Sequence, residues 1–260
     1  MRLVSVLFLF FFLLSGTIHA GERFVITTRP GISTDVFWHA TPNAQATVFV
    51  LPGGDGGFGV VQNGLPGSRN FLVRTASYWI SDEGFNYMVF GNPSDRPALD
   101  YPDRVTTDHL TDLKEALAWL KTKTTTPIWI VGTSRGTVSA ALALISIKDS
   151  QIAGGVFSSS ITSLSKAGAL PGQDLARINV PVLVVHHEAD ACNVTRPQEV
   201  PLIFNALSNA PVKKLLMMSG GSGASGNPCR ALHTHGYVGI EQSTVHSIAT
   251  WIRATGSLGR

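Results

Sequence analysis

The sequence predicts an α/β protein with a mainly parallel, doubly wound sheet. Short apolar runs, typical of strands buried on both faces, alternate with amphipathic or apolar helical segments along the chain. One such run, residues 128–131, leads through a turn with two glycines into a short-chained apolar segment. With 260 residues, 44% hydrophobic and 14% charged, the chain is long enough for one large domain with a well-buried core.

The predicted elements follow one another in a regular order. Residues 22–28 and 35–39 alternate in polarity and predict an opening hairpin at the sheet edge, with Pro30 and Gly31 at its turn. Further strands are predicted at residues 46–51, 87–90, 128–131, 153–157, 180–186 and 213–218. Helices are predicted at residues 70–80, 106–121, 137–147, 198–208 and 243–254. Each crossover between parallel strands is expected to be right-handed.

Residues 1–20 are predicted to be a secretory signal peptide that precedes a single domain, residues 21–260. Arg2 is a short positive region, residues 3–14 are almost entirely apolar, and residues 15–20 are mostly small and end in Ile-His-Ala. The apolar stretch is short for a membrane span, so we expect cleavage after Ala20 and no stable membrane insertion. The protein is expected in the periplasm or secreted.

Charge and motif content exclude several classes of partner. The net charge is only +3 and the basic residues form no cluster, so no nucleic-acid partner is expected. The glycine-rich residues 53–57 fit neither a dinucleotide-binding motif nor a phosphate-binding loop with its lysine. No metal-ligand spacing is present either. We expect no cofactor and no metal, and a small molecule as the partner.

Residues 132–136, Gly-Thr-Ser-Arg-Gly, indicate a nucleophile. A buried strand, a serine between two glycines and a helix form the context of a nucleophile elbow, in which the serine occupies a strained turn. Side chains at the two flanking positions would collide with the strand and the helix, which favours Gly132 and Gly136 there. Ser134 is therefore the predicted catalytic nucleophile.

A serine hydroxyl needs a base that takes its proton and a carboxylate that orients the base. The strand at residues 180–186 runs into a polar loop that ends in Asp190. Asp190 is the favoured acid, and Glu188 in the same loop is the alternative. For the base, His235 is favoured because Gly236 permits a tight bend after it, and His233 is the alternative.

The remaining histidines are expected to serve other roles. The sequence predicts structural positions for His39, His109 and His246, which lie on an edge strand and two helices. His186 and His187 stand at the end of the strand that precedes the acid, and we expect them to line the site.

Two cysteines, Cys192 and Cys229, are the only ones in the chain, and an exported protein meets an oxidising compartment. We predict a disulfide between them; the alternative is two separate buried thiols. Closing a loop of about 38 residues is worth roughly 4 kcal/mol in the chain-entropy model. The bond would tie the loop of Asp190 to the loop of His235.

An oxyanion hole requires backbone donors that are already in place. One is predicted to be the N–H of Arg135, which follows the nucleophile. The second is predicted in the loop after residues 46–51, where Gly54 is favoured and Gly53 and Asp55 are the alternatives.

These motifs resemble the α/β-hydrolase superfamily over nearly all of residues 21–260. The resemblance rests on Leu-Pro-Gly-Gly-Asp-Gly at 51–56, the serine pentapeptide, the loop ending in Asp190, and His-Gly-Tyr at 235–237. It implies the α/β-hydrolase fold and acyl transfer to water. Only about 20 residues separate Ser158 from the next strand, so no large cap domain is expected. Small carboxylesterases and dienelactone-hydrolase-like proteins are similar, although dienelactone hydrolases use a cysteine where this chain has Ser134.

The predicted function is an exported serine hydrolase that cleaves carboxylic esters through an acyl-enzyme on Ser134. The same three residues equally support an amidase, a peptidase or a thioesterase, and a catalytically silent binding protein is a further alternative. Arginine at position 135 is unusual beside a nucleophile. Its side chain either pairs with a carboxylate such as Glu241 or favours anionic substrates.

Overall fold

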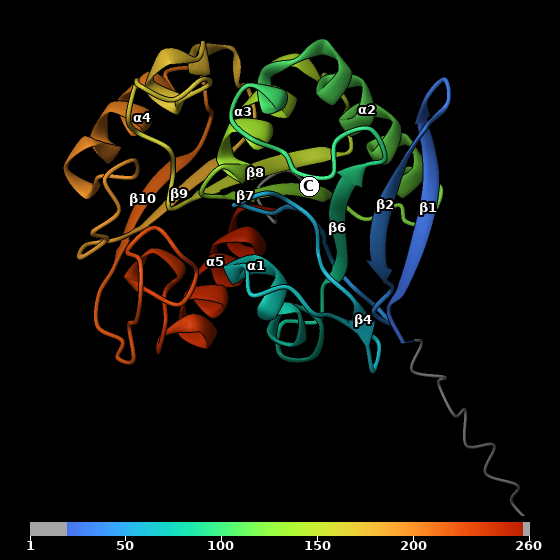
Figure 1. Cartoon of the computed structure of the whole chain (residues 1–260), viewed down its shortest axis with the longest axis horizontal. Coiled ribbons are helices and arrows are strands. Elements are labelled where there is room, and N and C mark those ends of the chain that lie inside the picture. Colours follow the sequence, from blue (N-terminus) through green and yellow to red (C-terminus); the bar gives the residue numbers. More distant parts are fainter. Residues whose placement is uncertain (1–19, 257–260) are drawn as a thin grey trace, which may run out of the picture.

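The computed structural model of the protein describes residues 20–256. These residues form a mixed sheet of eight strands with helices on both sides (Figure 1). In spatial order, the strands are β1 (Glu22–Arg29), β2 (Ile32–His39), β6 (Asn86–Pro93), β3 (Thr47–Leu51), β7 (Ile128–Thr133), β8 (Ile152–Ser158), β9 (Val182–His187) and β10 (Lys213–Met218). The strands β6, β3, β7, β8, β9 and β10 run parallel, while β1 and β2 form the predicted antiparallel hairpin at one edge. A separate small ladder joins β4 (Val61–Gln62) to β5 (Leu65–Pro66).

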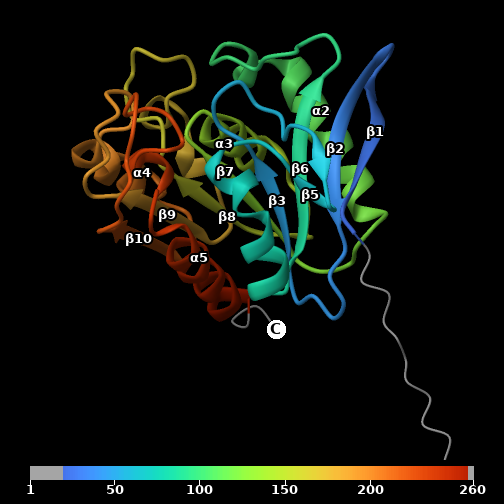
Figure 2. The ribbon, with the colours of Figure 1, turned by 60° about the horizontal axis from the view of Figure 1, so that its bottom comes forward.

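The helices cover the two faces of the sheet in two groups. One face carries α2 (Thr107–Lys121), α3 (Gly136–Ser146) and α4 (Val200–Ala206). The other face carries α1 (Phe71–Arg74) and α5 (Glu241–Gly256). Figure 1 shows the two groups above and below the sheet, and Figure 2 brings α5 to the front. The predicted doubly wound architecture is therefore present.

The side chains of β3 show why its sequence is apolar without alternation. Phe49 and Leu51 pack in the core that includes α2 and α3, whereas Val48 and Val50 pack in the core that includes α1 and α5. Successive side chains of a strand point to opposite faces, so a strand covered on both faces is apolar at every position. All five residues of β3 are buried.

The predicted helix at residues 70–80 has a different form in the structure. α1 ends at Arg74, and a π-helical turn follows at Tyr78–Asp82. The hydroxyl of Thr75 donates to the carbonyl oxygen of Phe71 at 2.8 Å and also reaches that of Leu72. The carbonyl oxygen of Phe71 also accepts the N–H of Thr75 at 3.2 Å. A threonine hydroxyl that bonds back in this way bends a helix, and the regular helix ends at this residue. The remaining predicted strands and helices are present, with ends shifted by a few residues.

Residues 1–19, which hold most of the predicted signal peptide, lie outside the described residues. Gly21, the first residue after the predicted cleavage point, is buried, and a Cβ added there would lie 2.2 Å from Cζ of Phe37. Across residues 20–256, none of the helices has both the length and the apolar character required to cross a membrane.

Candidate active site

Ser134 lies at the tip of the turn between β7 and α3 with a φ of 51°. This left-handed conformation costs a residue with a side chain on the order of 1–3 kcal/mol, and such strain is concentrated at functional sites. The N–H of Ser134 donates to the carbonyl oxygen of Ser158 at 2.9 Å, so the turn is attached to the end of β8. The strand, strained serine and helix match the predicted elbow.

The two glycines beside Ser134 have no room for a side chain. A Cβ on Gly132 would lie 2.5 Å from the carbonyl oxygen of Gly136, and a Cβ on Gly136 would lie 2.0 Å from that of Leu51. Both distances are far shorter than a van der Waals contact, and both neighbours are backbone. The elbow therefore requires glycine at both positions, for the steric reason that the sequence suggested.

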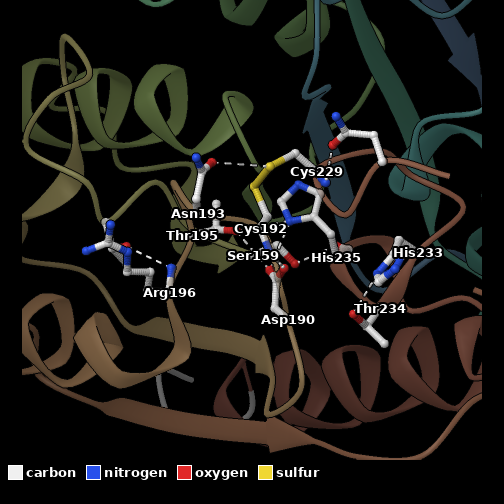
Figure 3. The surroundings of a disulfide bond; sticks show 12 residues. Ser159, Asp190, Cys192, Asn193, Thr195, Arg196, Cys229, His233, Thr234 and His235 are labelled. Atoms are coloured by element: carbon white, nitrogen blue, oxygen red, sulfur yellow. Dashed lines mark hydrogen bonds and ion pairs between the residues drawn. A yellow bond between two sulfur atoms is a disulfide. The ribbon is translucent and has the colours of Figure 1, made fainter.

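Asp190 and His235 meet beyond the carboxyl ends of the parallel strands, at the same end of the sheet as Ser134. Asp190 follows β9, and His235 lies in a 3-10 turn, Thr234–Gly236, between β10 and α5. His235 Nδ1 lies 2.9 Å from Asp190 Oδ2, and both side chains are buried (Figure 3). Because an ionised carboxylate only accepts, the proton between the two groups is assigned to Nδ1. Nε2 is then free to accept a proton.

The carboxylate of Asp190 has a dense set of hydrogen-bond partners. Thr195 Oγ1 donates to Oδ2 at 2.9 Å, and the N–H of Cys192 donates to Oδ1 at 3.0 Å. His186 Nε2 lies 3.4 Å from Oδ2. Burial alone raises the pKa of Asp190, but the hydrogen bonds from His186 and His235 outweigh it and hold the pKa well below its usual value. Asp190 is therefore ionised at neutral pH.

The two alternative residues do not take part in this pair. Glu188 is exposed, and its backbone N–H donates to the carbonyl oxygen of Met218. His233 contacts Thr234 Oγ1 through Nδ1 at 3.0 Å. The structure thus brings together the favoured acid and the favoured histidine.

The other histidines have structural partners. His186 Nε2 also contacts the carbonyl oxygen of Thr195 at 2.8 Å, and His187 Nε2 contacts that of Gly220 at 2.9 Å. Both rings are buried, and their contacts connect the end of β9 to the backbone at Thr195 and Gly220. As predicted, His39, His109 and His246 lie on β2, α2 and α5.

Ser159 and Tyr237 connect the elbow to the histidine loop. Ser159 follows β8, and its hydroxyl donates to the carbonyl oxygen of His235 at 2.8 Å. The hydroxyl of Tyr237 accepts a hydrogen bond from Ser158 at 3.0 Å and donates to the carbonyl oxygen of Val185 at 3.1 Å, and Ser159 Oγ lies 3.1 Å from it. The carbonyl oxygen of Ser158 also accepts the N–H of Ser134, so one buried hydrogen-bond network connects the nucleophile to His235.

Sequence reasoning missed Thr195, Ser159 and Tyr237. All three are fully buried, and burial raises the pKa of Tyr237 to about 12. One signal was available, because a run of three serines directly after an apolar strand, residues 158–160, is unusual for a buried segment. The partners of these residues lie far away in the sequence, so no local pattern identifies them.

The loop at residues 52–57, here called the oxyanion loop, packs against the elbow. A Cβ on Gly53 would lie 2.9 Å from Cβ of Ser134 and 2.7 Å from the carbonyl oxygen of Thr133. Gly54 has a φ of 58°, and the N–H of Gly56 donates to the carbonyl oxygen of Gly53 at 3.2 Å. Within residues 20–256, the N–H groups of Gly54 and Arg135 donate to no other residue. Both are available to a ligand.

The side chain of Arg135 does not pair with Glu241. Glu241 Oε1 accepts from Arg74 at 2.9 Å, because α5 lies on the opposite face of the sheet from α3. Arg135 Nη1 instead lies 3.1 Å from carboxylate oxygens of both Asp55 and Asp100. Arg135 therefore joins the oxyanion loop to the loop before α2. Its charge has two carboxylates beside it, which argues against the alternative role in binding anions.

Cys192 and Cys229 form the predicted disulfide, with their Cα atoms 4.5 Å apart. Figure 3 shows this bond beside Asp190 and His235. The N–H of Cys192 donates a hydrogen bond to the Asp190 carboxylate, and Cys229 belongs to the glycine-rich segment that leads to His235. The bond connects the two loops that supply the acid and the histidine.

Between β8 and β9, the described chain contains only short 3-10 turns, at Leu170–Gly172 and Leu175–Arg177. This segment is too short for a cap domain, as predicted. Two surface cavities of about 270 and 290 Å³ lie near the amino ends of the central strands, lined in part by Ile152 and by Ala46. Ser134, by contrast, lies at the carboxyl end of β7, so the cavities are at the other end of the strands.

No protein-family model and no curated protein sequence matches this chain. Solved structures do match. An α/β serine hydrolase homologue from Coxiella burnetii is 18% identical over 90% of this chain and 98% of its own, with a TM-score of 0.59. An esterase from Pyrococcus furiosus is 17% identical over 90% and 91% of the two chains, with a TM-score of 0.61.

A third similar structure bears on the cap. It is an α/β serine hydrolase without a lid from Xanthomonas campestris, 16% identical over 87% of this chain and 94% of its own, with a TM-score of 0.58. At such identities the likeness concerns the fold. The strand order, the elbow after β7 and these similar structures lead to one conclusion: the chain has the α/β-hydrolase fold, with no large cap domain in residues 20–256.

Proposed function

We propose that this protein is an exported serine hydrolase that cleaves carboxylic esters through an acyl-enzyme on Ser134. The observation that carries the proposal is the buried contact between His235 Nδ1 and Asp190 Oδ2, at the sheet edge where Ser134 occupies its strained turn. Similar structures described as serine hydrolases and esterases support the same chemistry.

In the first half-reaction, Ser134 Oγ attacks the carbonyl carbon of the ester while His235 Nε2 takes the hydroxyl proton. Asp190 stays ionised and stabilises the imidazolium that forms. The N–H groups of Arg135 and Gly54 donate to the oxygen that becomes negative. His235 then gives its proton to the leaving alcohol as the carbon–oxygen bond to it breaks, and the acyl group remains on Ser134.

In the second half-reaction, water attacks the acyl carbon and His235 Nε2 accepts one of its protons. The bond to Ser134 Oγ breaks, and His235 returns the proton to the serine. The carboxylic acid leaves, and the site is restored. Each step uses the same N–H groups, because both tetrahedral intermediates carry their negative charge on the same oxygen.

The direct test is labelling of the purified protein by a fluorophosphonate probe, which reacts with an activated serine. Wild type should be labelled, Ser134→Ala should not, and the labelled peptide should contain Ser134. Ser165→Ala is a suitable control, because Ser165 lies on an exposed turn. Equal labelling of wild type and Ser134→Ala would contradict the catalytic role and favour a silent binding protein.

The acyl preference is tested separately. Hydrolysis of p-nitrophenyl esters of increasing chain length should be compared with that of matched thioesters, amides and short peptides. We expect the highest kcat/KM on an ester of a small or medium acyl group. A higher kcat/KM on peptides or thioesters would identify a peptidase or a thioesterase that uses the same residues.

Export is proposed from the signal-like residues 1–20 and is supported by a disulfide between the only two cysteines. Amino-terminal sequencing of protein recovered outside the cytoplasm should begin at Gly21. A protein that begins at Met1 and stays with the membrane fraction would contradict cleavage.

A further inference from the structure

Arg104 is a buried cation directly behind the oxyanion loop. Only 1% of its surface is exposed, which is rare for arginine. Its guanidinium donates to three neutral oxygens: the carbonyl of Leu99 at 3.3 Å, the hydroxyl of Ser139 at 3.0 Å and the carbonyl of Gly54 at 3.1 Å. Buried charges are usually paired with an opposite charge. In the described part of the chain, no carboxylate lies within ion-pair distance of Arg104.

The charge of Arg104 is retained at neutral pH. Burial lowers the pKa of its guanidinium to about 10, and the nearby Arg135 contributes in the same direction. Interactions with Tyr101, Asp100 and Asp103 act in the opposite direction. A full positive charge therefore lies behind the loop that faces Ser134, at a cost in desolvation that a purely structural contact would avoid.

Two of the three acceptors come from the parts of the site that carry the proposed oxyanion donors. Gly54 belongs to the oxyanion loop, whereas Ser139 lies on α3, the helix whose amino end supplies the N–H of Arg135. Ser139 Oγ accepts from Arg104 and lies 2.8 Å from Nε2 of the buried His109, whose pKa burial lowers to about 3. Arg104 thus links the two proposed oxyanion donors through a buried network.

The bond to Gly54 also fixes the direction of a peptide group. A peptide unit is planar and trans, so its N–H points away from its carbonyl. With the carbonyl of Gly54 held toward Arg104, the N–H of Asp55 points to the other side, and the left-handed residue Gly54 is anchored at its carbonyl end. A cation on this carbonyl oxygen also polarises the Gly54–Asp55 peptide and makes the N–H of Asp55, the alternative oxyanion donor, a stronger donor. The N–H of Gly54 belongs to the preceding peptide, so Arg104 acts on it only by fixing the backbone of the oxyanion loop.

We propose that Arg104 is a positioning residue for catalysis, which holds the oxyanion loop against α3 and adds a buried positive charge behind the developing oxyanion. This inference rests on the proposed hydrolase function. Losing one oxyanion donor typically lowers kcat by about 100- to 1000-fold. Because Arg104 acts through Gly54, we expect a smaller loss, about 10- to 100-fold.

The test compares Arg104→Met, Arg104→Lys and wild type on one p-nitrophenyl ester. Arg104→Met should lower kcat by about 10- to 100-fold with KM within about threefold, since the donors act mainly in the transition state. A boronic acid forms a charged tetrahedral adduct on serine. Its affinity for Arg104→Met should be lower than for wild type by the same factor as kcat. Arg104→Lys keeps the charge and should recover part of the loss. Unchanged kcat, or a change in KM alone, would overturn the proposal.

Arg253→Met provides a control away from the site, at a partly exposed arginine that is paired with the carboxylate of Glu83. Arg253 also donates to a backbone carbonyl, that of Glu83, but from α5 and away from the site. Its kcat should equal that of wild type even if its melting temperature falls. If Arg104→Met does not fold, Ser139→Ala removes one of the three acceptors. Its kcat should fall several-fold at constant KM, and an unchanged kcat would again overturn the proposal.

Hydrogen–deuterium exchange separates this inference from the proposed function. Amides of residues 53–57 should exchange faster in Arg104→Met than in wild type, while the amides of β3 should not change. This measurement needs no substrate. Faster exchange in a protein whose wild type hydrolyses nothing would refute the hydrolase and retain the positioning of the loop. Unchanged exchange together with an active wild type would refute the role of Arg104.

Discussion

The two halves of the proposed site are held in place by different means. The elbow and the oxyanion loop are fixed by backbone, with glycines at 53, 132 and 136 that leave no space for a Cβ. The half with Asp190 and His235 is held by side chains, through Thr195, Ser159 and the disulfide. The elbow is a short turn between β7 and α3, whereas residues 219–233 form a long glycine-rich segment. A short connection is fixed by sterics, and a long one needs cross-links.

The largest effect should come from the acid itself. Asp190→Asn keeps the size of the side chain but cannot stabilise an imidazolium, and its amide favours the wrong tautomer of His235. We expect kcat to fall by about 10,000-fold with KM little changed. Glu188→Gln, in the same loop, is the control and should stay within twofold of wild type. The opposite ranking would make Glu188 the acid.

Removal of the disulfide should lower the stability of the whole domain and loosen the half held by side chains most. Cys192→Ser combined with Cys229→Ser should lower the free energy of unfolding by roughly 4 kcal/mol, measured by urea denaturation. Exchange of the amides of residues 186–196 and 219–235 should accelerate, while that of β7 and α3 should follow the global change. A loss below about 1 kcal/mol would mean that the side-chain contacts suffice.

Gly136→Ala tests the half held by backbone. The added Cβ would lie 2.0 Å from the carbonyl oxygen of Leu51, so β3 or α3 must shift. We expect a loss of about 3 kcal/mol in stability, with kcat reduced as well. Gly256→Ala is the control, since a Cβ there would meet no atom within 4 Å. A fully active and stable Gly136→Ala variant would show that the elbow tolerates displacement.

Acid should weaken the network behind the elbow. The pKa of His109 is lowered by burial, and by Arg104 and Arg29, to about 3. Below about pH 6.5, His109 is protonated in the unfolded chain but stays unprotonated in the folded chain until about pH 3. His109 therefore makes the free energy of unfolding fall as the pH drops from about 6.5 towards about 3. The slope is at most about 1.4 kcal/mol per pH unit. His109→Gln should reduce this slope in urea titrations between pH 5 and 7, and an identical slope would contradict the assignment.

The smallest effect concerns one hydroxyl in the half held by side chains. Thr195→Val removes the hydrogen bond from Oγ1 to Asp190 Oδ2 without changing the size of the side chain. Because hydrogen bonds to charged groups are among the stronger ones, we expect the loss of this bond to lower kcat by about tenfold. Thr195→Ser restores the hydroxyl and should restore the rate. If serine fails to rescue, packing of the threonine methyl group matters more than the bond.

The sequence allowed the fold and the candidate residues to be predicted because both leave local signals. An apolar run such as residues 128–131 marks a strand covered on both faces, and the glycines beside Ser134 mark a turn with no space. Loop position and the residue that follows favoured Asp190 over Glu188 and His235 over His233. Those signals depend on near neighbours in the chain.

The rest depends on contacts between distant segments. Arg135 meets Asp55 and Asp100 because three loops converge at one sheet edge, and no spacing in the sequence indicates that meeting. Thr195 lies 40 residues from His235 in the chain, and the two side-chain atoms are 3.2 Å apart. The regular helix ends at Thr75, whose hydroxyl bonds back to the carbonyl oxygen of Phe71, and helix periodicity does not register such a bond.

The hydrogen bond between the N–H of Ser134 and the carbonyl of Ser158 makes the nucleophile part of the central ladder of β7 and β8. Ser134 therefore leaves its place only when the middle of the sheet separates, whereas His235 can leave when a few side-chain bonds open. On heating, the hydrolase proposed here should stop working below the temperature at which its circular dichroism signal is lost. Its activity should return on cooling from that interval, because the sheet that carries the nucleophile has not come apart.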